Sequence, residues 1–194
     1  MKKIVLIIAL LSATIFSATA KGFYFETGLG LGVSITELEN TSVSSIAPNL
    51  DEMSVDIGFK MGYGPLNTTL PLYIVGEFAG AGHRLGNGYS YVQFNSYIIG
   101  PGIVIYLTPI FQVAGSFGFS LAADQFSTGG NYYGSGFAGN ASLAFDIGKY
   151  KNGCLIGFKW FGSSNTLTTS VKQNSNMFGI FVKYTFRHKD HKWF

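Results

Sequence analysis

The sequence predicts an all-β protein, an eight-stranded antiparallel up-and-down transmembrane β-barrel. Three observations predict it: bulky apolar residues alternate with small or polar ones along eight segments, 26 of the 194 residues are glycine, and only 12% are charged. Alternation with a period of two places one set of side chains on each face of a strand. A helical bundle would lose roughly 1 kcal/mol at each internal glycine relative to alanine, and a disordered chain would be richer in charge and poorer in aromatic residues. The composition therefore excludes both classes.

Residues 1–20 have the features of an export signal. Lys2 and Lys3 form a basic start, Ile4–Leu11 is an unbroken apolar run, and Ala18–Ala20 matches an A-x-A cleavage pattern. The apolar run is too short for a spanning helix, which needs about 20 residues. We therefore expect a signal peptide that is cleaved after Ala20, a barrel over residues 21–186 and a basic periplasmic tail over residues 187–194.

The expected strands follow one another along the chain, each identified by its alternating pattern. The first alternates from Phe23 to Ile35, with glycine at every second position from Gly28 to Gly32. Each of the others alternates bulky apolar residues with small or polar ones in the same way. Cys154, the single cysteine, is expected at a lipid-facing position as a small apolar residue. The expected strands are 23–35, 55–63, 72–81, 92–107, 111–121, 137–147, 156–160 and 178–186.

The fourth expected strand contains a break in phase. Val92, Phe94 and Ile98 carry its apolar face before Gly100-Pro101-Gly102, and Ile103, Ile105 and Leu107 carry it afterwards. Proline cannot donate a hydrogen bond to a ladder, so we expect a bulge at this point.

The connections alternate in length along the chain. The segments 65–71, 108–109 and 149–153 are short, whereas the segments 38–52, 84–88, 125–135 and 163–174 are mostly longer and rich in Ser, Thr, Asn and Gly. Short turns at one end and longer loops at the other are typical of up-and-down barrels of the bacterial outer membrane. We therefore expect both termini in the periplasm.

The less bulky face of the strands decides between a soluble and a membrane barrel. In a soluble, lipocalin-like barrel this face would meet water and would carry many Lys and Glu residues, but here it is mostly Gly, Ala, Ser and Asn. Small residues suit the interior of an eight-stranded barrel, which is just wide enough for side chains to fill. Aromatic residues gather toward one rim of the opposite face, as an interfacial girdle would: Phe23, Tyr63, Tyr106, Phe111, Phe145, Tyr184 and Phe186.

The few charges on the inward face nearly balance. An unpaired charge in a narrow lumen costs several kcal/mol, so these charges should be paired. We expect Glu26, Lys60 and Lys183 to meet where the first and last strands close the barrel, as a buried structural contact rather than a gate or an ion path. The predicted interior charge network comprises Glu26, Asp56, Lys60, Glu77, Asp146, Lys159 and Lys183.

The final segment carries a resemblance to a known family. Phe178, Ile180, Val182, Tyr184 and Phe186 alternate and end in Phe, as in the last strand of outer-membrane barrels. With the signal peptide, the strand count and the glycine-rich inward face, residues 22–186 resemble the small eight-stranded barrels, the group of OmpX, OmpW, the transmembrane domain of OmpA and the opacity proteins. The resemblance implies that these five residues form the signal read by the barrel-assembly machinery. Phe194, at the end of the tail, is a second candidate for the terminal Phe.

The sequence offers no convincing catalytic, cofactor or metal residues. Gly28–Gly32 lacks the G-x-G-x-x-G spacing of a dinucleotide loop and is interpreted as an inward glycine stripe. His188, Asp190 and His191 are interpreted as a solvated tail, and His83 has no recognisable nucleophile beside it. Tyr132 and Tyr133, in the loop before the sixth strand, are interpreted as interfacial anchors rather than as adhesive contacts. We therefore expect no enzyme, no cofactor and no metal site.

Two hypotheses for the function remain. The first is a structural, surface-exposed scaffold whose loops contact a host surface or extracellular ligands. The second is a narrow pore for small or hydrophobic solutes, as the OmpW resemblance implies. The expected partners are outer-membrane lipid and the barrel-assembly machinery; the net charge of +3 includes Lys2 and Lys3 of the signal, so nothing indicates nucleic acid.

Overall fold

The computed structural model describes residues 22–39, 41–42, 53–66, 70–86, 91–126, 130–148, 152–168 and 170–187. The predicted signal peptide, and the predicted tail beyond Arg187, lie outside the described residues. In the ranges described, the chain has no helix that is long and apolar enough to cross a membrane.

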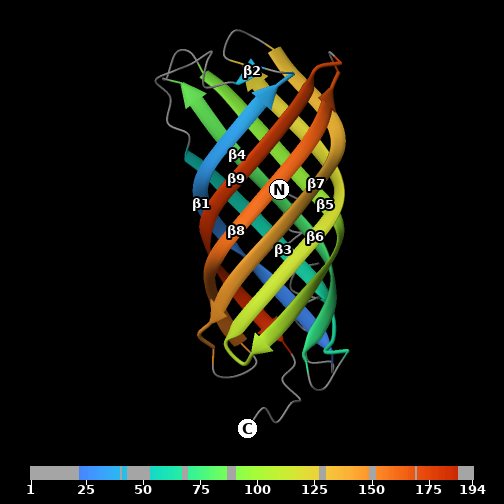
Figure 1. Ribbon diagram of the computed structural model, residues 1–194, viewed down its shortest axis with the longest axis vertical. Coiled ribbons are helices and arrows are strands. Elements are labelled where there is room, and N and C mark those ends of the chain that lie inside the picture. The colour runs from blue at the N-terminus through green and yellow to red at the C-terminus, as the bar shows by residue number, and fades with distance from the viewer. Residues whose placement is uncertain are drawn as a thin grey trace, which may run out of the picture.

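Eight long strands form a closed antiparallel barrel (Figure 1). Neighbours in the chain pair with one another, and β1 also pairs with β9 from Tyr24–Arg187 to Leu38–Gln173, which closes the sheet. A two-residue strand, β2, pairs with the last residues of β1. The predicted eight-stranded up-and-down barrel is confirmed. The strands are β1 (Phe23–Leu38), β2 (Thr41–Ser42), β3 (Met53–Tyr63), β4 (Leu72–Gly86), β5 (Tyr91–Thr108), β6 (Phe111–Phe126), β7 (Gly130–Asp146), β8 (Asn152–Leu167) and β9 (Lys172–Arg187).

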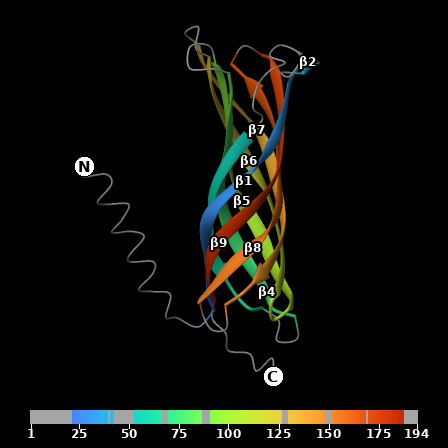
Figure 2. The ribbon, with the colours of Figure 1, turned by 90° about the vertical axis from the view of Figure 1, so that its left-hand side faces the viewer.

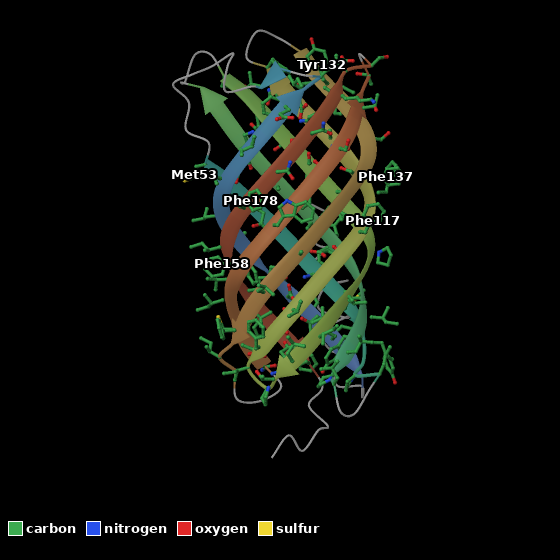
Figure 3. All side chains as sticks on the ribbon, in the orientation of Figure 1. Met53, Phe117, Tyr132, Phe137, Phe158 and Phe178 are labelled. Carbon is green, nitrogen blue, oxygen red and sulfur yellow. The ribbon has the colours of Figure 1, made fainter. Side chains whose placement is uncertain are left out.

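The outward face of the barrel is an apolar band. Alternate residues of every long strand point away from the wall, and large side chains such as Phe117, Phe137 and Phe158 are more than 60% exposed (Figure 3). A continuous exposed apolar surface of this extent marks contact with a membrane or a partner. The band therefore has the character of a lipid-facing surface.

The two ends of the barrel differ in their outward residues. At the end where β1 begins and β9 ends, called here the terminal end, the outward positions include the aromatic residues Phe23, Tyr63 and Tyr184. At the opposite, distal end they become polar, as at Glu37 and Asn174, which are in register with each other. Figure 2 shows the strands rising steeply between the two ends. The apolar band is therefore shorter than the barrel, whose distal part is polar on its outer surface.

The predicted break in the fourth long strand is wrong. The β4–β5 register runs without a shift from Leu72–Ile105 to Gly86–Tyr91. Among the described residues, the β5–β6 register shifts only at Tyr106–Thr108, beside the turn. Because the strand keeps one phase, Phe94, Ile98 and Tyr106 point inward and are at most 2% exposed. Tyr106 therefore does not belong to the aromatic rim. Tyr97, Ile99 and Pro101 occupy the outward positions instead.

The predicted loop lengths at the distal end are largely wrong. The long strands extend through much of the segments 84–88, 125–135 and 163–174, leaving the connections 87–90, 127–129 and 168–171. Polar and glycine-rich residues continue the strands there, because a strand beyond a lipid band needs no apolar outward side chains. Tyr132 and Tyr133 accordingly lie in β7 rather than in a loop. Of the distal connections, only residues 39–52 are long, and they include β2.

Replacing Phe158 by Arg tests the lipid-facing character of the outward band. Phe158 lies in register with Leu143 and Ile180, which are also exposed, so an arginine there would lie in hydrocarbon. We expect the free energy of unfolding in lipid vesicles, measured by urea titration, to fall by about 2–4 kcal/mol. The matched variant Ser135→Arg, on the polar distal part, should lose less than about 1 kcal/mol. Equal losses in the two variants would contradict the position of the band.

Candidate functional site

The interior of the barrel begins with a row of alternating charges. Glu26 on β1, Lys60 on β3 and Glu77 on β4 are direct cross-strand neighbours on the inward face. Lys60 Nζ lies 3.3 Å from Glu26 Oε1 and 3.9 Å from Glu77 Oε1, and the three side chains are at most 2% exposed. Opposite charges on adjacent strands stabilise a sheet, and they are essential where water is excluded.

Lys183 on β9 joins this row at the closure of the barrel. Its ammonium group donates a 2.7 Å hydrogen bond to Glu26 Oε1. In register, Lys183 faces Gly28, where a Cβ would lie 2.6 Å from Lys183 Cγ. Glycine at this position therefore leaves the room that the lysine stem needs. The structure thus brings Glu26, Lys60 and Lys183 together at the seam between the first and last strands.

Two further contacts cross the lumen. Lys159 on β8 pairs with Asp56 on β3, although β9 and β1 lie between these strands in the sheet. Asn140 on β7 donates a 2.5 Å hydrogen bond to Glu77 on β4, with β5 and β6 between them. Groups on strands that do not touch can bond in this way only where side chains fill the space between the walls.

The terminal end of the lumen is closed by a polar and aromatic layer. Gln112 Nε2 donates to the hydroxyl of Tyr24 at 2.9 Å and to that of Tyr106 at 3.0 Å. Gln112 lies on β6 and Tyr24 on β1, which are diametrically opposite in the eight-stranded wall. Tyr24 in turn donates a 2.6 Å hydrogen bond to Glu26 Oε2, so this layer is linked to the charge row.

Arg187 is an interior charge that lies within the predicted tail. It is the last residue of β9, it is 5% exposed, and its guanidinium group lies 2.8 Å from Asp146 Oδ2. The guanidinium carbon also lies 3.7 Å from the ring centre of Tyr106, a cation–π contact. The alternation of Lys183, Thr185 and Arg187 on one face is the signal that could have identified it.

Apolar and hydroxyl side chains fill the lumen above the charge row. Ile98, Phe161 and Met177 pack together with small alanines, and each is at most 1% exposed. Nearer the distal end, Thr36 Oγ1 lies 3.2 Å from His83 Nε2 and 2.9 Å from Ser175 Oγ. A cavity of about 10 Å³ adjoins these groups, which is enough for one water molecule at most. His83 therefore has a hydrogen-bond partner in Thr36 but no space beside it for a substrate.

The other sequence-predicted residues take the following places. The seven predicted interior charges are all inward and at most 4% exposed. Four are brought together around Glu26 and Glu77, Lys159 pairs with Asp56, and Asp146 lies apart with Arg187. Cys154 is a partly exposed free thiol on the outward face, while His188, Asp190, His191 and Phe194 lie outside the described residues. Within the described ranges, no group of three or more His, Cys, Asp or Glu could hold a metal ion.

Comparisons with known proteins agree on the fold. The sequence matches no family model and no curated protein. Among solved structures, Ail, the attachment invasion locus protein of Yersinia pestis, aligns over 84% of this chain and 99% of its own, with a TM-score of 0.54 and 16% identity. That structure is a complex with the heparin analogue sucrose octasulfate; a second Ail structure aligns with a TM-score of 0.53. Neisserial surface protein A aligns over 87% of this chain and 98% of its own, with a TM-score of 0.49 and 12% identity.

The chain therefore has the fold of the small eight-stranded outer-membrane barrels. At these identities the likeness concerns the fold and not the activity.

Replacing Glu26 by Ala tests whether the interior charges stabilise the barrel. The change leaves Lys183 without its 2.7 Å partner and leaves Lys60 with Glu77 at 3.9 Å. We expect the free energy of unfolding in lipid vesicles to fall by about 3–5 kcal/mol, as for other broken buried pairs. The exposed Glu37→Ala serves as the control and should change it by less than about 0.5 kcal/mol. If Glu26→Ala unfolds at the same urea concentration as the unmodified chain, the network does not stabilise the fold.

Proposed function

We propose that this chain is an outer-membrane barrel that serves as a structural, surface-exposed scaffold. The apolar outward band supports a position in a bilayer, and a closed barrel is one of the two backbone arrangements that can span one. The observation that carries the proposal is the filled lumen. Contacts between non-adjacent strands cross it at Tyr24–Gln112, at Asp56–Lys159 and at Glu77–Asn140.

The filled lumen favours the scaffold over the narrow pore. An aqueous path would have to pass the Gln112 layer, the charge row and the layer of Ile98, Phe161 and Met177 in turn. These layers are held together by hydrogen bonds or by close packing. The interior of an eight-stranded barrel is just wide enough for side chains, so it leaves no additional space for a water-filled path. The side chains that would line a pore are therefore the ones that hold the barrel together.

Planar-bilayer recordings distinguish the scaffold from the pore. We expect the refolded chain without residues 1–20 to give no discrete channels, because the interior is closed at several levels. The double variant Tyr24→Ala with Gln112→Ala removes the diametric bridge and serves as a comparison for partial opening, after its fold has been verified by circular dichroism. Reproducible channels from the unmodified chain, free of contaminating porins, would refute the scaffold and support the pore.

Export and assembly follow from the same proposal. Residues 1–20 would direct the chain across the inner membrane and be removed after Ala20. The barrel-assembly machinery would then recognise the last strand by its outward residues, which run from Phe178 to Phe186 and lie in register with β1. We propose Phe186 rather than Phe194 as the terminal Phe of this signal, because Phe186 is the last outward residue of β9.

The distal rim is the surface that we propose for extracellular contacts. It projects beyond the apolar band and carries exposed polar and aromatic residues, among them Tyr133, which is 59% exposed, and Arg84, which stacks 3.9 Å from the ring centre of Tyr91. Ail was solved with a heparin analogue, so a sulfated sugar is one ligand class to test here. Because most distal connections are short, we propose that the strand ends and residues 39–52 form the contact surface together.

An inserted epitope tag tests which end of the barrel faces outward. A tag placed between Thr128 and Gly129, in the distal β6–β7 connection, should bind antibody on intact bacteria. The same tag between Pro109 and Ile110, in the β5–β6 turn at the terminal end, should bind only after the outer membrane is permeabilised. The reverse labelling pattern would overturn the orientation and, with it, the distal contact surface.

A further inference from the structure

Three polar side chains form a buried cluster near the distal end of the lumen, called here the distal amide cluster. Asp124 on β6, Asn165 on β8 and Gln173 on β9 all point inward and are at most 2% exposed. Asn165 and Gln173 are cross-strand neighbours. Gln173 reaches across the lumen and donates a 3.2 Å hydrogen bond from Nε2 to Asp124 Oδ1. Gln173 therefore lies beside Asn165 on the wall and reaches Asp124 across the lumen.

The distal amide cluster has polar atoms without partners. Asp124 Oδ2, Gln173 Oε1, and both Oδ1 and Nδ2 of Asn165 are buried and make no hydrogen bond. Buried polar atoms are nearly always bonded in folded proteins, so these four unbonded atoms call for an occupant. Three of the four atoms are oxygens that can only accept or ligate.

Asp124 also differs from the other buried carboxylates. In the part of the chain that the structure describes, Glu26, Asp56, Glu77 and Asp146 each have a Lys or Arg within 4.0 Å, whereas no ion pair is found for Asp124. Its Oδ1 accepts hydrogen bonds from Gln173 and from the backbone N–H of Asn95, both of which are neutral donors. A buried carboxylate that lacks a cation carries a large energetic cost.

The wall beside the distal amide cluster carries no side chains at two inward positions on its β7 side. β7 lies between β6 and β8, and two of its inward positions at this level are Gly134 and Gly136, with Gly136 in register with Asn165. Aromatic rings adjoin the cluster: Tyr132, in register with Asp124, lies 5.2 Å from the ring of Phe126. Rings at this position reduce the access of water, which strengthens the attraction between a carboxylate and a cation.

We propose that the distal amide cluster binds a hard divalent cation, Ca²⁺, through Asp124 Oδ2, Asn165 Oδ1 and Gln173 Oε1, with water completing its shell. An all-oxygen set of carboxylate and amide groups suits Ca²⁺ rather than transition metals. Mg²⁺ is disfavoured because it requires near-ideal octahedral geometry and gives up its water reluctantly. A site with one carboxylate should be weak, with a dissociation constant of about 10⁻⁴–10⁻³ M, in the range of extracellular calcium modules.

Terbium luminescence tests this site directly. Tb³⁺ replaces Ca²⁺ on oxygen ligands and is excited by a nearby tyrosine, here Tyr132. The refolded full-length barrel in a zwitterionic detergent, free of lipopolysaccharide, should give a Tb³⁺ signal that Ca²⁺ displaces. Ca²⁺ should also raise the thermal unfolding midpoint relative to a chelator, because a ligand that binds only the folded state stabilises it.

Variants of the distal amide cluster make the test specific. Asp124→Asn keeps the shape but removes the charge, so it should weaken Ca²⁺ binding by about tenfold or more, whereas Asn165→Asp adds a charged ligand and should strengthen binding by about tenfold. Glu37→Gln removes an exposed acid at the same end and should change nothing.

Two outcomes would overturn the proposal. No Tb³⁺ signal and no Ca²⁺ stabilisation of the unmodified chain at about 10 mM would mean that water alone satisfies the cluster, because even the weakest calcium modules bind near 10⁻³ M. Equal binding by the unmodified chain and the two cluster variants would place the ion elsewhere. If Asp124→Asn does not fold, Gln173→Leu takes its place and must weaken binding while Glu37→Gln does not.

Discussion

The structure depends on a constraint that an eight-stranded wall imposes: the space it encloses is filled by side chains, so every charge that points inward needs a partner. Glu26 shows how this is met. It accepts hydrogen bonds from Lys183, Lys60 and the Tyr24 hydroxyl. Tyr24 in turn accepts one from Gln112, which also donates to Tyr106. Removing Glu26 would leave Lys183 buried without its hydrogen-bond partner. Glu26 therefore links the charge row to the Gln112 layer near the terminal end of the barrel.

This interior lets the outer surface carry most of the barrel's apolar residues. In a soluble protein the bulky side chains form the core, whereas here Leu29, Leu31 and Ile57 are more than half exposed and Glu26, Asp56 and Lys60 are buried. This exposure of apolar residues and burial of charged ones explains why the chain carries so few charged residues. It also separates two roles. The strands and the side chains that fill the lumen make the barrel rigid, and the residues of the distal rim can change without disturbing the fold.

Much of the fold could be predicted from the sequence because the period of two assigns each residue to a face. The alternation from Phe23 to Ile35 is unbroken, and it correctly placed Glu26 inward. The same rule, continued past Phe186, would have placed Arg187 inward as well. The error at Phe94 and Ile98 arose from treating bulk as a sign of lipid contact, whereas one uniform phase along β5 places both inside.

Which residues meet across the lumen could not be predicted in this way. Alternation gives the face but not the partner, because a contact such as Gln112–Tyr24 depends on strand tilt and stagger around the whole barrel. The length of the strands could not be predicted either, since polar residues that continue a strand beyond the lipid resemble loop residues in the sequence. The seam contact among Glu26, Lys60 and Lys183 was accessible because register along adjacent strands can be counted from a rim.

The position of Lys183 on the last strand has a consequence for how the barrel is completed. Before β9 pairs with β1, Glu26 lacks one of its two cationic partners. Lys159 and Asp56 then lie toward opposite edges of the open sheet. Formation of the final hydrogen-bonded ladder and neutralisation of the interior therefore occur together. An incomplete sheet would expose charge to hydrocarbon, so the bilayer itself favours the fully closed ring over any partly assembled form.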